Sequence, residues 1–260
     1  MARPPAIPFR DLLDLPFAEL ARRALRPVRV AVLDTGIDAS HEALSGRVAR
    51  ATAWRSDGRG GFVPAPLRRG ENNDPCGHGT GVAGVIAAFA PNAVLEDVRV
   101  LDADGGGHGA VVLEGLRRAV EGDAEIVNVS VAFARDRHWA ETSRLLEEAY
   151  VRGRIVVAAR RNVPRPGDLG LPAELPTAVS VDAGRFGDPF LLRYFPHARI
   201  EFAARGEDVA TARAGGGRIR LSGTSLATPA VAAICALLRG ANPGLSLFEI
   251  KTLLKHHAVR

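Results

Sequence analysis

Three polar residues stand in short motifs rich in small side chains: Asp34 in AVLDTGID at 31–38, His78 in GHGTGVAG at 77–84, and Ser225 in SGTSLATPA at 222–230. A serine hydroxyl is a poor nucleophile at neutral pH and needs a base to take its proton. His78 could be that base, and a buried carboxylate such as Asp34 could hold the imidazole in the required tautomer. Each residue alone is more often structural, so it is the combination that predicts nucleophilic catalysis at a carbonyl group.

A fourth candidate could stabilise the negative charge that such a reaction creates. Asn162 follows the apolar run IVVAA, and its side-chain amide could donate a hydrogen bond to the attacked oxygen. Ser225 opens a stretch with helical character, and the partial positive charge of a helix N-terminus favours the same oxyanion. Asparagines in loops usually serve turns. Asn162 is therefore a candidate only because the other motifs accompany it.

The elements that must position these residues alternate along the chain. Five apolar runs predict buried, mostly parallel strands, at 28–33, 98–101, 126–129, 155–158 and 178–181. Stretches with helical character lie at 79–89, 110–120, 139–152, 225–239 and 247–256. The alternation predicts an α/β fold, a doubly wound, mostly parallel sheet with helices on both faces. In such sheets, ligands bind beyond the carboxyl ends of the strands.

Residues 28–260 are expected to form this single domain, preceded by a short N-terminal arm at 1–27. Within the arm, Phe17 to Leu25 could form an amphipathic helix. The glycine-dense pieces at 55–62, 102–109 and 212–218 are expected to be surface loops, because glycine disfavours the interiors of helices and strands.

Composition excludes several classes of partner. The net charge is +5, but the basic residues are scattered among acids, so no nucleic-acid partner is expected. No apolar run approaches the roughly 20 residues that span a bilayer, and the first residues do not resemble a secretory signal. A cytoplasmic protein without a membrane partner is expected, with Cys76 and Cys235 as free thiols. Cys76 either lies near the cleft of His78 or is a small buried thiol.

The three motifs resemble those of the subtilisin-like (subtilase, S8) serine peptidases, and intervening segments extend the resemblance over most of the chain. The order Asp, His, Ser is the known order of subtilisin. The resemblance implies a subtilisin-like fold and a catalytic triad of Asp34, His78 and Ser225, with Asn162 as the oxyanion donor. It also implies a protein or peptide substrate and an acyl-enzyme formed without a cofactor.

Two further segments resemble the strands that hold the substrate backbone in this family. NVSVA contributes Ser130, Val131 and Ala132, and DADGGGHG contributes Gly105 and Gly107. A peptide added between them as a strand would be recognised mostly through its main chain, leaving pockets for alternate side chains.

The pocket for the side chain before the scissile bond departs from the family pattern. Arg160 and Arg161 stand where the family has small residues and glycine, just before Asn162. Their guanidinium groups would narrow the pocket, attract carboxylates or turn out to solvent, and the sequence does not choose among these. Ala132 replaces a frequent glycine and adds a methyl group at the rim. The resemblance also implies a cis peptide before Pro172.

The sequence is too short at two places for features of secreted relatives, a calcium loop and a pro-domain. Their calcium loop would have to fit between the His-bearing helix and the next strand, at about 90–93, whereas calcium takes roughly six to eight oxygen ligands. No metal is therefore expected. Only a short arm precedes Asp34 in place of a pro-domain, so the chain folds unaided, receives help from a partner, or uses the arm as an autoinhibitory leader.

These observations favour an intracellular serine endopeptidase of restricted specificity, acting on a dedicated partner protein or a precursor peptide. The arginines before Asn162 and the hazard of an unguarded protease in the cytosol both favour restriction. Two alternatives stay open: a catalytically weak peptide-binding module with a subtilisin fold, and an acyl-transfer enzyme in which an amine resolves the acyl-enzyme. The same motifs would serve hydrolysis and transfer.

Overall fold

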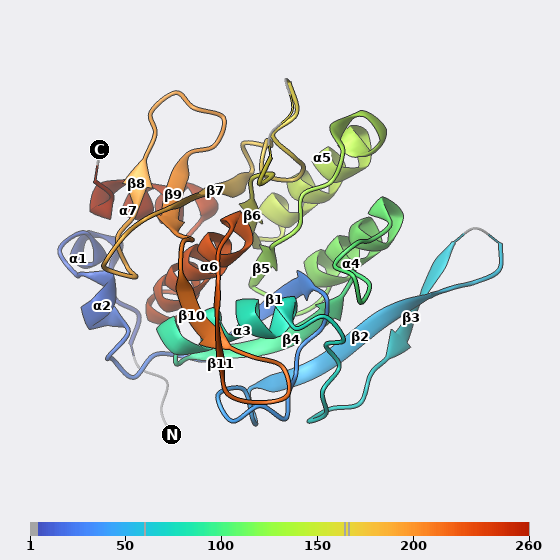
Figure 1. The fold of residues 1–260 in the computed structure, drawn as a ribbon. Helices are drawn as coiled ribbons and strands as arrows, with labels where there is room; N and C mark the ends of the chain where they lie inside the picture. Colours follow the sequence, from blue (N-terminus) through green and yellow to red (C-terminus); the bar gives the residue numbers. More distant parts are fainter. Residues whose placement is uncertain (1–4, 60, 164, 166, 260) are drawn as a thin grey trace.

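A nine-stranded sheet forms the centre of the protein in the computed structural model, which describes residues 5–59, 61–163, 165 and 167–259 (Figure 1). Its strands are β1 (Val28–Asp34), β2 (Val48–Ser56), β3 (Phe62–Pro66), β4 (Ala93–Arg99), β5 (Ile126–Val129), β6 (Ile155–Ala159), β7 (Ala178–Gly184), β8 (Arg193–Tyr194) and β9 (Phe202–Arg205). The spatial order is β3-β2-β4-β1-β5-β6-β7-β9-β8. All pairings from β2 across to β9 are parallel, and β3 and β8 add antiparallel edges.

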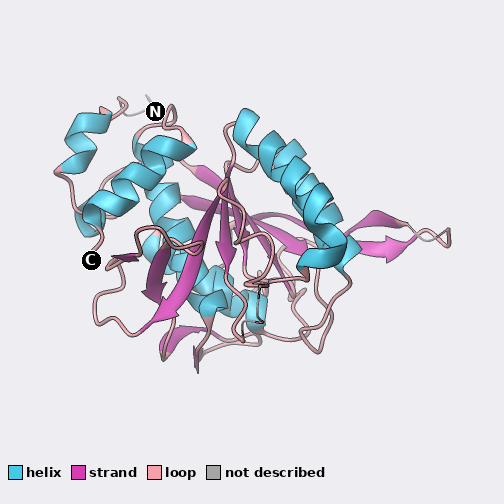
Figure 2. Cartoon of the chain, turned by 90° about the horizontal axis from the view of Figure 1, so that it is seen from above, coloured by secondary structure: helices cyan, strands magenta, loops and turns pink. Residues whose placement is uncertain are grey.

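Helices cover both faces of this sheet (Figure 2). One layer contains α3 (His78–Phe89), α6 (Thr224–Ala241) and α7 (Leu247–His257), and the other contains α4 (Gly109–Glu121) and α5 (Arg135–Val151). Side chains of β1 alternate between the two cores: Val30 and Val32 face the α6 layer, whereas Ala31 and Leu33 face the α4 layer. Burial on both faces explains the continuous apolar runs of the sequence. The predicted α/β class is confirmed.

The helix α6 is the central helix of the first layer. All of its residues are buried. Pro229, the sixth residue of α6, has no N–H for the Ser225 carbonyl four residues earlier, and that carbonyl accepts the Ser130 hydroxyl at 3.0 Å instead. By length and composition α6 could cross a membrane, but its whole length is buried within the fold. Its apolar composition is therefore that of a core helix.

Most predicted elements agree with the structure within a few residues, but the strand expected at 98–101 is wrong. The strand β4 runs from Ala93 to Arg99 and so begins five residues earlier. Two acidic residues interrupt the apolar run there, yet both find partners: Glu96 pairs with Arg29, and Asp97 accepts a backbone N–H from the loop after β1. Tertiary contacts thus allow charged residues in β4, although hydropathy alone predicts a strand that begins after them.

Two of the glycine-dense pieces are hairpin turns whose ends belong to strands. The piece at 55–62 joins β2 to β3, and the piece at 212–218 joins β10 (Val209–Ala212) to β11 (Arg218–Leu221). Neither hairpin is evident from hydropathy, because the paired residues of β2, β3 and β11 are half-buried or exposed. The third piece, at 102–109, is a loop that ends where α4 begins.

The described part of the N-terminal arm packs into the fold, as α1 (Phe9–Leu13) and α2 (Phe17–Leu20) beside α7 (Figure 1). The single helix expected over Phe17–Leu25 is wrong, because α2 ends at Leu20 and the chain then turns to enter β1. The N–H of Ile7 donates to the carbonyl of Ala241, at the last turn of α6. Ser225 lies about 24 Å away along that helix, at about 1.5 Å per residue. The described part of the arm therefore lies away from Ser225.

Candidate active site

The structure brings together the three residues expected to form a triad. Asp34 is the last residue of β1, His78 the first of α3 and Ser225 the second of α6. The Nδ1 atom of His78 lies 2.7 Å from Asp34 Oδ1, and its Nε2 atom lies 2.8 Å from Ser225 Oγ. The carboxylate is 1 % exposed and Ser225 is 7 % exposed. The Nε2 atom of His78 can thus accept the proton of Ser225, while its Nδ1 atom is held by the buried Asp34 carboxylate.

A glycine permits the close approach of β1 and α3 on which this geometry depends. A Cβ atom on Gly79 would lie 2.2 Å from the carbonyl oxygen of Gly36 and 3.1 Å from the Asp34 side chain. Any other residue would force the helix away from the carboxylate. The N–H of Thr35 also donates to Asp34 Oδ1, at 2.7 Å, which fixes the carboxylate plane.

The charges around His78 raise its pKa above the ordinary value. Burial acts in the opposite sense and lowers the pKa, because it disfavours the imidazolium. Burial is the largest single influence, but the negative charge and hydrogen bond of Asp34 and the charge of Asp74 together outweigh it. The ring is therefore a stronger base than a free histidine, as general-base catalysis requires.

Asp74 organises the site, although it lies outside the three motifs and was not predicted as a site residue. Its buried carboxylate accepts hydrogen bonds from the hydroxyls of Thr35 at 2.8 Å and Thr80 at 2.6 Å. It also accepts three backbone N–H groups at the start of α3, from Cys76, Gly77 and Thr80. Asp74 thereby ties the segment after Asp34 to both sides of His78. A carboxylate just before a helix N-terminus was the signal available in the sequence.

The side chain of Asn162 is oriented by its neighbour Thr224. Its Oδ1 atom accepts the Thr224 backbone N–H at 2.9 Å and the Thr224 hydroxyl at 3.0 Å. Because a backbone N–H can only donate, the oxygen must face Thr224 and the amide nitrogen must point the other way. A Cβ atom on Gly223 would lie 3.3 Å from Ser225 Oγ, 3.4 Å from Asn162 Oδ1 and 3.6 Å from Asn162 Nδ2, so the amide of Asn162 and the hydroxyl of Ser225 border the same space. This is where an oxyanion would form.

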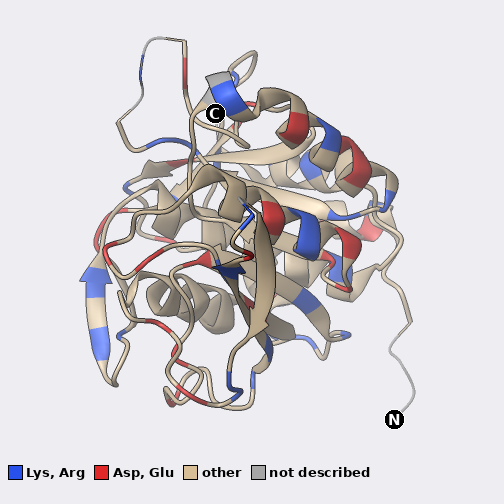
Figure 3. Cartoon of the chain, turned by 90° about the vertical axis from the view of Figure 1, so that its right-hand side faces the viewer, with Lys and Arg blue, Asp and Glu red and all other residues tan. Residues whose placement is uncertain are grey.

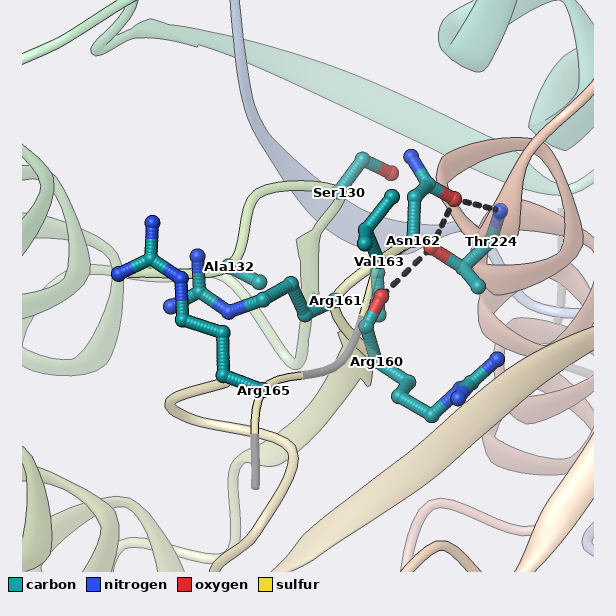
Figure 4. Close-up of a pocket in the computed structure, with 9 residues that line it drawn as sticks. Ser130, Ala132, Arg160, Arg161, Asn162, Val163, Arg165 and Thr224 are labelled. Carbon is teal, nitrogen blue, oxygen red and sulfur yellow. Dashed lines mark hydrogen bonds between the residues drawn. The ribbon is translucent and has the colours of Figure 1, made fainter. Parts of the chain in front are cut away.

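A pocket of about 370 Å³ adjoins Asn162 and Thr224 (Figure 4). Arg160 and Arg161 both line it, but their guanidinium groups go different ways. Arg160 pairs with Asp182 at 3.0 Å and points away from the pocket, whereas Arg161 pairs with Asp168 at 3.1 Å and extends past Ala132. Neither side chain is turned fully to solvent, since 23 % and 20 % of their side-chain surfaces are exposed.

The expected substrate-binding segments lie beside the site in forms that differ from the expectation. β5 ends at Val129, and the hydroxyl of Ser130 donates to the Ser225 carbonyl at 3.0 Å, so Ser130 supports the nucleophile's backbone. Ala132 lines the pocket, and the half-buried Val131 lies between the two.

The segment at 102–109 forms a turn, and not a strand, in this structure. The N–H of Asp102 donates to the carbonyl of Gly106 at 2.8 Å, and Gly105 has a φ of +76°. These contacts close a turn in the segment that carries Gly105 and Gly107. The cis peptide expected before Pro172 is present.

Comparison with known proteins decides the family. The sequence profile described as "Peptidase_S8: Subtilase family" matches residues 26–260. This chain belongs to the subtilase family. The subtilase is 34 % identical over 240 residues to alkaline elastase YaB of Bacillus sp. (strain YaB), covering 89 % of this chain and 59 % of the relative. It is 29 % identical over 243 residues to subtilisin of Bacillus pumilus, covering 89 % and 83 %.

A solved structure supports the same fold. Sphericase superposes on the subtilase with a TM-score of 0.71 at 24 % identity, covering 96 % of this chain and 89 % of that one. The predicted subtilisin-like fold is therefore confirmed. The subtilase spans 59 % of the length of alkaline elastase YaB and 60 % of that of subtilisin E of Bacillus subtilis (strain 168).

No group of three or more histidine, cysteine or acidic residues that could hold a metal ion occurs in the described part of this subtilase. The connection between α3 and β4 consists of residues 90–92 only, as short as the sequence suggested. The expectation that no metal is needed stays a prediction, to be tested with a chelator. Of the two thiols, Cys235 is buried and Cys76 is exposed in the groove that His78 also lines.

Proposed function

We propose that this subtilase is a serine endopeptidase that hydrolyses peptide bonds through an acyl-enzyme. The observation that carries the proposal is the continuous hydrogen-bond chain from Asp34 through His78 to Ser225, beside an amide aimed by Thr224. A carboxylate that orients an imidazole, which in turn contacts a hydroxyl, is the arrangement needed to activate a serine.

In the first half of the reaction, Ser225 Oγ attacks the carbonyl carbon and its proton passes to His78 Nε2. The electron pair of the C=O double bond moves to oxygen, where Asn162 Nδ2 and the backbone N–H of Ser225 stabilise the charge. That N–H lies in the first turn of α6 and has no acceptor within the helix. Asp34 stabilises the imidazolium. The C–N bond then breaks, and the imidazolium gives its proton to the leaving amine.

In the second half, a water molecule attacks the acyl-enzyme. His78 takes a proton from the water, and the same donors hold the second oxyanion. The bond to Ser225 Oγ breaks, the product leaves as a carboxylic acid, and the proton on His78 returns to the serine. Every step uses the same imidazole, first as base and then as acid, which is why its pKa must be poised near working pH.

The proposal includes restricted specificity, for a partner protein or a precursor peptide. It is supported by the pocket beside Asn162, where Arg161 and the Ala132 methyl group occupy space at the wall. A pocket with bulky charged walls rejects many side chains that a pocket lined by glycine accepts.

A cytoplasmic location and the absence of nucleic-acid and membrane partners are part of the same proposal. The two cysteines are free, which suits a reducing compartment. Positions of acidic and basic residues alternate along the helices in Figure 3. On α5, for example, Glu148 pairs with both Arg144 and Arg152. Such mixing disfavours binding to a polyanion. Fractionation of cells, with the protein followed by antibody, tests the location: recovery outside the cytoplasm would contradict it.

The chemistry is tested by labelling with a fluorophosphonate and by mass spectrometry of peptide products. The wild type should be labelled on Ser225 and should release two products whose masses sum to substrate plus water. Ser225→Ala should lose both labelling and turnover, whereas Ser222→Ala, an exposed serine of the same motif that accepts the Asp208 N–H, should keep both.

Two outcomes would contradict hydrolysis. A folded wild type that is neither labelled nor active would favour a peptide-binding module. Products in which the acyl fragment is joined to an added amine, without free acid, would favour acyl transfer.

A further inference from the structure

The pocket beside Asn162 carries an excess of positive charge. Arg160, Arg161 and Arg165 all line it, and no carboxylate is found among its described lining residues. Asp182 neutralises Arg160 from one side and Asp168 neutralises Arg161 from another. Arg165 forms no ion pair within the residues that the structure describes. One guanidinium charge at the pocket is therefore left without a partner.

The directions of the three side chains separate them into two groups (Figure 4). Arg160 points away from the pocket, toward β7. Arg161 and Arg165 both extend to the side of the pocket where Ala132 lies, opposite Asn162 and Thr224. Since Asn162 marks the oxyanion position, a substrate side chain entering here belongs to the residue just before the scissile bond.

Arg161 is held in place by packing as well as by charge. A Cβ atom on Gly170 would lie 2.7 Å from the Cβ atom of Ala132 and 3.2 Å from that of Arg161, so these three residues are in tight contact. Together with the ion pair to Asp168, this packing makes the stem of Arg161 a fixed wall. Arg165 is exposed and free to adjust to a ligand.

We propose that Arg165, with Arg161 as the fixed wall beside it, makes the pocket select peptides with Glu or Asp immediately before the scissile bond. This inference rests on the proposed endopeptidase function. A carboxylate can accept a bidentate, charge-assisted hydrogen bond from a guanidinium and would balance the unpaired charge. A Lys or Arg side chain at the same place meets the unpaired positive charge of Arg165. Large aromatic side chains meet the Arg161 stem and the Ala132 methyl group.

The test compares the kcat/KM values of peptide p-nitroanilides Ala-Ala-Ala-X with Glu, Gln, Asp, Ala, Phe or Lys at X. Glu and Gln have nearly the same shape, so their ratio isolates the charge. We expect the wild type to prefer Glu over Gln by about 10-fold or more, the size of a charge-assisted hydrogen bond. Because the site is partly exposed, the preference should fall at high salt.

Arg165→Gln should bring the Glu-to-Gln ratio to about one, and Arg165→Glu should favour Lys. Arg144→Gln is the matched control, because it removes the same charge from an exposed position on α5. A wild-type ratio near one, or a preference that survives Arg165→Gln, would overturn the proposal.

The failure of this inference can be told apart from the failure of the proposed function. If no anilide is cleaved, the same peptides with a free carboxamide and a fluorescent label are bound to Ser225→Ala, and their Kd values are measured by anisotropy. Tighter binding of the Glu peptide than of the Gln peptide, lost in Ser225→Ala combined with Arg165→Gln, would support the pocket assignment without turnover. Equal Kd values would contradict it.

Discussion

The side-chain oxygen of Asn162 accepts the backbone N–H of Thr224 at 2.9 Å, and this contact directs the amide nitrogen toward the space next to Ser225 Oγ. The donor is thus oriented before any substrate binds. Preorganised donors of this kind act mainly on the charge that develops in the transition state.

Asn162→Ala should therefore lower kcat by about 10²- to 10³-fold, the range known for loss of the equivalent donor in subtilisin, with little change in KM. Thr224→Ala should lower kcat much less, because the backbone N–H that orients the amide remains. Steady-state kinetics on one good substrate measure both. A rise in KM at constant kcat in Asn162→Ala would show that the amide binds the ground state instead.

The pH profile of kcat/KM should report the raised pKa of His78. The base must be unprotonated, so kcat/KM falls as pH falls through this pKa, and the midpoint should lie above the ordinary histidine value of 6.5. Asp74→Asn removes a negative charge that favours the imidazolium and should move the midpoint to lower pH. Asp123→Asn, at the exposed pair with Arg50, is the charge control. An unmoved midpoint in a folded Asp74→Asn would contradict this account.

Asp97 should make the protein less stable as pH rises. Burial raises the pKa of Asp97 to about 8 from 3.8, and the nearby charges of Asp74 and Asp34 also raise it. Between these two values the folded protein holds a proton that the unfolded chain releases, so the free energy of unfolding falls with increasing pH. Asp97→Asn is neutral throughout and should flatten this fall. Urea unfolding at about pH 5 and about pH 8 measures the free energy of unfolding at each pH. The same decrease between the two pH values in wild type and Asp97→Asn would exclude the mechanism.

Thiol reagents should inhibit the enzyme through Cys76 alone. Cys76 is exposed in the groove that His78 lines, so a bulky adduct there would obstruct substrate. Burial raises the pKa of Cys235 to about 12, which leaves that thiol unreactive. Iodoacetamide should therefore inactivate wild type and Cys235→Ser but spare Cys76→Ser. Residual activity after a timed reaction is the measurement, and equal loss in all three would point to a different target.

Chelation should leave the stability unchanged. Only residues 90–92 connect α3 to β4, too few to supply the roughly six to eight oxygen ligands of a calcium ion. A ligand bound only by the native state raises Tm by mass action, so a structural ion would reveal itself as a drop in Tm on adding EDTA. Thermal unfolding with and without EDTA is the test, and a large drop would show a metal site.

The candidate triad of this protein could be predicted from its sequence, because it depends on residue types in short motifs. Asp34, His78 and Ser225 each stand where a buried strand ends or an apolar helix begins, and both signals are local. The α/β class followed from the alternation of continuous apolar runs with helical stretches. These features need no knowledge of which distant segments meet.

Only the tertiary structure decided what depends on such meetings. The sequence left three fates open for Arg161, and Asp168, seven residues along, decided among them by pairing with it at the pocket wall. The bounds of β4 depended on partners for its acidic residues, and the described part of the arm packs against α6 and α7. Side-chain direction and the neutralisation of charge arise from tertiary contacts, some of them between segments far apart in the chain. Local propensity carries no information about them.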